Sequence, residues 1–196
     1  MRKDLIASAV AVVLCTLVLG LAYPLLTTGA AQALFGGKAD GSQVTRDGEV
    51  VGSRLIAQDF AGEPVYFQAR PSQTDYAGDA SDFANLGPNQ RDLLDLTRER
   101  IAAYLERERP YIPGLRTAGI PVDAVTNSGS GVDPHISQAN AHIQANRVAR
   151  ERGAELTEVL ALVDEHTDGR FLGVLGEPGV NVLELNLALD EELPKR

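Results

Sequence analysis

Apolar and polar positions divide the chain into a long uncharged start and a mixed remainder. From Leu5 to Leu26 the sequence LIASAVAVVLCTLVLGLAYPLL has no charged residue. About 22 helical residues extend roughly 33 Å, and a bilayer core needs about 20. The pattern therefore predicts a single N-terminal transmembrane helix, with residues 1–28 as the anchor and one domain beyond it.

The same start also has features of a cleavable signal peptide. Arg2 and Lys3 provide a basic beginning, and Ala31-Gln32-Ala33 has the small-x-small form of a cleavage site. A signal peptide usually has an apolar region of about 7 to 15 residues, whereas no charge occurs here between Asp4 and Lys38. We favour a retained anchor, and the alternative is a secreted hydrolase or binding protein released after Ala33.

Charges on either side of the apolar segment predict its orientation. Arg2 and Lys3 lie directly before it, and the next basic residue is Lys38. Because basic residues stay on the cytoplasmic side, we expect a cytoplasmic N-terminus and an extracytoplasmic C-terminal domain. Tyr23 fits an interfacial aromatic residue, and Pro24 is placed to kink the helix near its outer end.

Beyond the anchor, turn residues separate short periodic segments. Residues 29–41 are rich in Gly and Ala and predict a linker or a frayed helix end, leaving 42–196 as the domain. Asp47-Gly48, between Val44-Thr45 and Val50-Val51, predicts a hairpin. A strand containing Val65, Tyr66 and Phe67 should follow, and Gln73 to Gln90 predicts a surface loop.

Helical spacing dominates the second half of the domain. We predict helices from Arg91 to Arg109, from an N-cap at Ser137 to about Arg152 before Gly153, and from near Leu156 to near His166. Arg170 to Leu175 predicts a strand, and Val180 to Leu189 fits either a strand or a helix. The sum is an α+β domain with a mixed sheet and flanking helices.

Composition limits the possible partners. The chain has 18 basic and 27 acidic residues, and from Leu5 onward its net charge is −10. This charge argues against binding nucleic acid or anionic lipid, and we interpret it mainly as a source of solubility. Cys15 is the only cysteine, so the domain has no disulfide.

The most unusual stretch outside the anchor is Val122 to Ser137, which contains Ser128-Gly129-Ser130-Gly131. It matches neither the phosphate-binding GxxxxGK[ST] motif nor the nucleophile motif GxSxG. Asp133, His135 and a nearby serine are too close in sequence to be expected to form a catalytic triad. Two interpretations remain open, a polar turn that caps a helix and a partner-binding loop.

Several short motifs resemble one protein family nearly end to end, the C subunit of the bacterial Kdp potassium-transporting ATPase. These motifs are Tyr23-Pro24-Leu25-Leu26-Thr27-Thr28, Gly52-Ser53 with Leu55-Ile56 and Gln58, Tyr66-Phe67, Arg70-Pro71-Ser72, Asn85-Leu86-Gly87-Pro88, Ser128 to Ser137, Gln144 with Arg147-Val148-Ala149, and Val180 to Leu183 with Leu185 to Asp190. Small departures occur at Asn127, Val132 and Gln138.

The resemblance implies a non-catalytic assembly and regulatory subunit of a high-affinity, ATP-driven potassium uptake complex in the bacterial inner membrane. It implies three partners: a channel-like potassium-binding subunit, a P-type ATPase subunit and a small single-span subunit. The chain lacks the DKTGT phosphorylation sequence, so ATP hydrolysis must occur on a partner. We expect the domain to cap the channel-like subunit on its outer side.

The family is also described as a catalytic chaperone that raises the ATP affinity of the pump subunit. A glutamine after the SGSG stretch has been given a role in this, and Gln144 is the matching position. An extracytoplasmic domain would not meet cytoplasmic nucleotide, so we expect no firmly bound cofactor, with ATP acting through the partner and potassium through the complex. Candidate partner contacts are Tyr23, Pro24, Leu25, Ser128, Gly129, Ser130, Gly131, Asp133 and His135.

Overall fold

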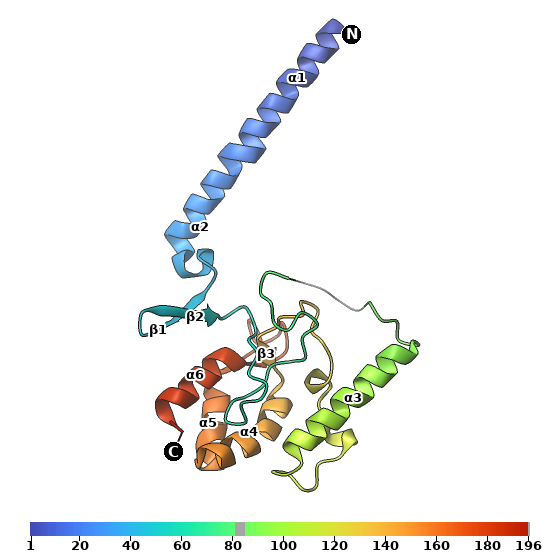
Figure 1. Ribbon diagram of the computed structural model, residues 1–196. Helices are drawn as coiled ribbons and strands as arrows, with labels where there is room; N and C mark the ends of the chain where they lie inside the picture. The colour runs from blue at the N-terminus through green and yellow to red at the C-terminus, as the bar shows by residue number, and fades with distance from the viewer. Residues whose placement is uncertain (81–84, 196) are drawn as a thin grey trace. The chain divides into compact units, whose positions relative to one another are not determined.

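A computed structural model describes residues 1–80 and 85–195 and has one long apolar N-terminal helix followed by helices and small sheets (Figure 1). The chain forms two compact units, Met1–Ser53 and Arg54–Arg196. The predicted α+β class with one N-terminal transmembrane helix is confirmed.

The first unit begins with α1 (Arg2–Leu17), a π-helical turn η1 (Val18–Ala22) and α2 (Tyr23–Ala39). Together they form one helix that is long and apolar enough to cross a membrane, and none of its residues is buried. The widened turn precedes Pro24, which lacks an N–H and whose ring crowds the carbonyl of Gly20. The Tyr23 N–H accordingly donates to the Val18 carbonyl, five residues back.

The helix continues through most of the predicted linker and ends at Ala39, with one non-helical residue at Phe35. The predicted hairpin follows as β1 (Gln43–Arg46) and β2 (Glu49–Ser53), which pair antiparallel. Asp47 and Gly48 have φ of 54° and 85°, the left-handed values that a type I′ turn requires.

The second unit contains the three predicted helices and a fourth in the stretch that fitted either a strand or a helix. These are α3 (Arg91–Glu108), α4 (Gln138–Arg152), α5 (Leu156–Glu165) and α6 (Val182–Glu192), with short 3₁₀ turns η2 (Thr117–Gly119) and η3 (Val122–Ala124). As predicted, the Ser137 side chain accepts from the Asn140 N–H at the start of α4, and Gly153 ends that helix with φ 65°. Val180 to Leu189, which fitted either structure, is mostly helix, because Asn181 caps α6.

Apolar side chains of α4, α5 and α6 form the main core, together with Phe67, Ile136 and Val180. Figure 1 shows α5 next to α4 and α6, against both of which it packs. A second, smaller core surrounds Tyr104 of α3. Two cores therefore meet along α4, which contributes Ile143 to the smaller one.

The sheet of this unit is antiparallel, whereas we predicted a mixed sheet. Its strands are β3 (His135–Ile136), β4 (Thr167–Asp168) and β5 (Gly179–Asn181), in the order β3-β5-β4. Two further strand predictions are wrong. Arg170 to Leu175 is a turn with one isolated bridge between Phe171 and Leu175, and Val65 to Phe67 is irregular.

The segment Pro64 to Gln68 is not a strand because side chains, in place of a neighbouring strand, bind its backbone. The Asn186 amide accepts from the Phe67 N–H at 2.8 Å and donates to the Phe67 carbonyl at 3.0 Å. The Arg147 guanidinium donates to the carbonyls of Pro64 and Tyr66, and that of Arg152 donates to the Val65 carbonyl. Phe67 can thus be fully buried without leaving backbone groups unpaired.

The predicted surface loop Gln73–Gln90 is only partly described, since 81–84 lie outside the described residues. Its described residues form turns and bends without a helix or strand. Ser72 stabilises the first of these turns by accepting from the N–H groups of Thr74 and Tyr76.

Candidate functional site

Gln144 lies on the buried face of α4 and is 1% exposed. Its carbonyl oxygen accepts from the Gln68 N–H at 2.7 Å and from the Arg147 guanidinium at 2.9 Å. Its amide nitrogen donates to the Gln68 carbonyl and to the Asn140 side chain, both at 3.1 Å. Every hydrogen-bonding position of the amide is used, so in this conformation Gln144 offers no group to a nucleotide.

Gln144 belongs to a continuous polar network between the two cores. Arg147 and Glu108 form an ion pair at 3.1 Å, and each side chain is 1% exposed. Burial lowers the pKa of Arg147 below its usual value, although the charge of Glu108 opposes this shift. At the other end, the Tyr104 hydroxyl donates to Asn140, and burial raises the pKa of Tyr104.

The Ser128-Gly129-Ser130-Gly131 loop stabilises its own backbone. The Ser128 hydroxyl accepts from the N–H groups of Gly131 at 2.9 Å and Asp133 at 3.4 Å. The Ser130 hydroxyl accepts from the Val132 N–H at 3.2 Å. Gly131 has φ 76°, a conformation that strongly favours glycine. The loop thus has the features of a tight polar turn.

This loop is also tied to distant segments. The Arg70 guanidinium donates to the Asn127 carbonyl at 2.8 Å and contacts the Asp133 carboxylate at 3.4 Å. The Ala57 N–H donates to the Val132 carbonyl, and the Val182 N–H donates to the Pro134 carbonyl. The loop therefore connects the start of the second unit with α6.

His135 lies between two carboxylates. Its Nδ1 is 3.4 Å from Asp133, and its Nε2 is 3.2 Å from Asp168 on β4. Hydrogen bonding to Asp133 and Asp168 raises the pKa of His135 despite partial burial. Burial would raise the pKa of Asp133, but the hydrogen bonds from His135 and the charge of Arg70 outweigh it and lower that pKa.

This geometry argues against a hydrolase built on Asp133 and His135. A triad histidine directs one ring nitrogen at an acid and the other at the nucleophile. Both nitrogens of His135 instead face carboxylates, and the serines of the loop bind its backbone. In the described residues, no group of three His, Cys, Asp or Glu side chains is arranged to hold a metal ion.

The other predicted contacts, Tyr23, Pro24 and Leu25, lie in the first unit, in the turn of helix that follows η1. Tyr23 is 62% exposed and Leu25 is 64% exposed. The structure brings Ser128 to His135 together, and these residues lie in the second unit.

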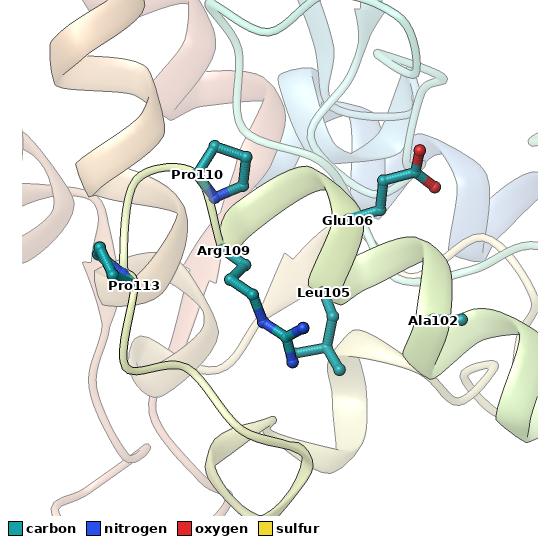
Figure 2. Close-up of a pocket in the computed structure, with 6 residues that line it drawn as sticks. All are labelled: Ala102, Leu105, Glu106, Arg109, Pro110 and Pro113. Carbon is teal, nitrogen blue, oxygen red and sulfur yellow. The ribbon is translucent and has the colours of Figure 1, made fainter.

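An open surface depression of about 710 Å³ lies at the end of α3 (Figure 2). Leu105 and Arg109 both contribute to its lining, and in Figure 2 the Glu106 side chain points in a different direction from Arg109. The Arg109 guanidinium donates a hydrogen bond to the Leu115 carbonyl at 3.3 Å, so its Nε–H is already used within the chain. The depression does not bring opposing reactive groups together.

A smaller cavity of about 260 Å³ includes Asn85, Arg100 and Asn127 in its lining. Burial lowers the pKa of Arg100, and the nearby Tyr76 and Glu99 oppose this shift. The Asn127 amide oxygen is buried and has no hydrogen-bond partner within the described part of the chain.

Sequence reasoning pointed to Gln144, Asp133 and His135 but missed the residues distant in sequence that bind them. The sequence pattern gave no sign of Asp168, which is the second carboxylate at His135. Asn181 and Asn186 carried a usable signal, because each is an amide inside the stretch Val180 to Leu189, which is otherwise apolar except for Glu184. Buried amides in such a pattern generally have specific hydrogen-bond partners.

The sequence was compared with known proteins. A model of the family described as K+-transporting ATPase, c chain (KdpC) matches residues 5–191. The potassium-transporting ATPase KdpC subunit of Koribacter versatilis is 48% identical over 196 residues, covering 99% of this chain and 97% of the relative. The subunit of that name from Rhodospirillum rubrum is 53% identical over 181 residues, covering 91% of each chain. The one from Mycobacterium bovis is 45% identical over 192 residues, covering 97% of this chain and 99% of the relative.

Replacement of Gln144 tests its structural role. Gln144→Ala would leave the Gln68 backbone and part of Arg147 unpaired in a buried setting, so we expect a loss of about 2–4 kcal/mol in the free energy of unfolding. Asn146→Ala is the matched control, because the Asn146 amide donates only to carbonyls of its own helix. Urea titration of the detergent-solubilised chain, followed by circular dichroism, measures both. Equal, small losses would contradict the assignment.

The carboxylates around His135 predict a pH dependence. The pKa of His135 is higher in the folded state than its ordinary value of 6.5, so protonated His135 stabilises the fold. This contribution is complete at pH values below 6.5 and disappears as the pH rises through the raised pKa. The native chain should therefore exceed His135→Gln in unfolding free energy by about 0.5 kcal/mol near pH 5.5, and the difference should vanish at alkaline pH. His142→Gln, on the exposed face of α4, is the control. A difference that stays constant with pH would refute this prediction.

Proposed function

The chain belongs to the KdpC family of potassium-transporting ATPase subunits, and we propose that it serves the assembly and regulation of such a complex. It is a subunit of the ATPase and not its catalytic subunit. The main support is the nearly full-length match, which includes both the apolar helix and the domain. The proposed role is in high-affinity potassium uptake.

The proposed partners are a channel-like potassium-binding subunit, a P-type ATPase subunit and a small single-span subunit. The apolar helix has no buried residue, which supports contact with partners within the membrane. The helix also continues about 12 Å past Leu26 before the non-helical residue Phe35, and Leu34 and Phe35 at this outer end are 71% and 60% exposed. Apolar side chains beyond the bilayer core favour a protein partner over water.

We propose that Tyr23, Pro24 and Leu25 contribute to this helix contact and that the domain caps the channel-like subunit on its outer side. Ser128 to Gly131 shape the loop, whereas the Asp133 and His135 side chains are about one-third exposed and remain accessible to a partner. In this proposal the loop is both a structural turn and a contact surface.

The chaperone role, in which the subunit raises the ATP affinity of the pump subunit, is also a proposal. The engaged amide of Gln144 favours an indirect route, in which Gln144 maintains the domain's shape and ATP binds on the partner. The predicted topology favours the same route, because an extracytoplasmic domain does not reach cytoplasmic nucleotide.

A secreted protein released after Ala33 is the competing hypothesis. Two observations favour retention of the helix: α2 continues through Ala31 to Ala33 without interruption, and the family match begins at residue 5. N-terminal sequencing of the mature protein separates the two hypotheses, because a start at Met1 or Arg2 leaves no role for cleavage after Ala33.

The assembly proposal predicts that the tagged chain carries the other ATPase subunits through detergent purification. Replacing Leu5 to Leu26 with a polyleucine span should keep the chain in the membrane but lower recovery of the partners, since the helix surface is lost. Complexes lacking the chain should require a higher ATP concentration for half-maximal hydrolysis. Assembly of a complete and fully active pump without this chain would refute the proposal.

The orientation proposal predicts which side of the membrane holds the domain. Ala103 is exposed on α3, so a cysteine in Ala103→Cys should react with an impermeant maleimide in intact spheroplasts. Asp4→Cys should react only after lysis, and it leaves Arg2 and Lys3 in place. The parent chain, with only Cys15, gives the background. Labelling of Asp4→Cys before lysis, with Ala103→Cys protected, would reverse the assignment.

A further inference from the structure

The loop between β4 and β5 exposes four large apolar side chains within five residues. Phe171, Leu172, Val174 and Leu175 are 70%, 78%, 71% and 57% exposed. The other large apolar side chains exposed in the described part of the second unit are scattered in sequence, at Leu55, Leu94, Val122 and Leu156. Single exposed apolar residues are ordinary, but a cluster of this kind is typical of an interaction surface.

Backbone hydrogen bonds hold the loop in a defined shape. Phe171 and Leu175 exchange N–H to carbonyl bonds of 2.8 and 3.0 Å, and the Gly173 N–H donates to the Arg170 carbonyl at 2.9 Å. Arg170 and Glu177 form an ion pair of 2.7 Å across its base. The loop is therefore a compact projection that presents apolar side chains to the outside.

This shape includes backbone strain. Leu172 has φ 53°, in the left-handed region that leucine seldom adopts, and its side chain stays exposed. The strain is thus not offset by burial of this side chain within the chain. A fixed shape favours a shaped protein pocket, because preorganisation lowers the entropy cost of specific binding.

The charges beside the loop indicate what kind of surface would receive it. Asp164, Glu165 and Asp168 precede it, and Glu177 follows it. Two basic groups oppose them, since Arg170 is paired with Glu177 and His135 with Asp168, so the flanks keep an excess of acidic charge. Acidic flanks disfavour an anionic bilayer surface and complement a basic rim.

We propose that Phe171 to Leu175 is a docking element that inserts into an apolar pocket with a basic rim on the outer surface of a partner subunit. The proposal rests on the proposed function, since it requires that the chain assembles with an integral membrane complex. It adds the segment that carries the contact and the chemistry of the surface that receives it.

Site-specific cross-linking tests the contact in the intact complex. A photoreactive benzoylphenylalanine at position 171 replaces one aromatic residue with another, and the same group at the equally exposed position 122 is the control. We expect a cross-link from position 171, and not from position 122, to another subunit of the ATPase. Cross-links from position 171 to lipid or to a second copy of this chain would overturn the proposal, as would absence of a cross-link in a complex that co-purifies.

A pair of double variants measures the contribution of the contact. Leu172→Asn with Val174→Ser removes two apolar side chains, and asparagine tolerates the left-handed backbone. We expect about tenfold less recovered partner at limiting concentration than with Leu94→Asn plus Val122→Ser, which removes the same groups elsewhere. Equal recovery would overturn the docking proposal but leave the proposed function standing. Failure of the unsubstituted chain to co-purify would instead reject the proposed function.

Discussion

The second unit depends on the way the peptide groups from Pro64 to Gln68 are paired. Phe67 and Gln68 are buried, and no strand among the described residues binds the segment. Side chains of α4 and α6 take the place of a strand. The Asn186 amide binds both the N–H and the carbonyl of Phe67, and the Gln144 amide binds both the N–H and the carbonyl of Gln68. The rotation of both helices is therefore fixed by hydrogen bonds as well as by apolar packing.

Sequence patterns identified the features that depend on neighbouring residues. The Asp47-Gly48 turn, the Ser137 cap and the Gly153 helix end follow from local backbone preferences, and all are present. The predicted strand at Val65 to Phe67 failed because its apolar pattern reflects burial among helices. The side chains that bind it are more than 70 residues away in the sequence, as in the pairs of Gln68 with Gln144 and Phe67 with Asn186.

The candidate site was predictable in its residue types but only partly in its geometry. Asp133 and His135 are two residues apart, so their proximity followed from the sequence. Asp168 reaches His135 only because β4 joins the sheet beside β5, and no local pattern carries that information. The same limit applies to Gln144, whose saturated amide becomes apparent only when Gln68 and Arg147 are placed around it.

The buried and fully hydrogen-bonded amide of Gln144 places a thermodynamic condition on any regulatory role. A subunit that does not bind ATP can raise a partner's ATP affinity only by binding the nucleotide-bound state of that partner more tightly than the free state. The coupling is reciprocal, so ATP must strengthen the attachment of this chain by the same factor. Gln144 can influence such a coupling by maintaining the surfaces of the domain. The contacts that distinguish the two states must then lie on the exposed surfaces, the helix and the outer loops, and not in the core.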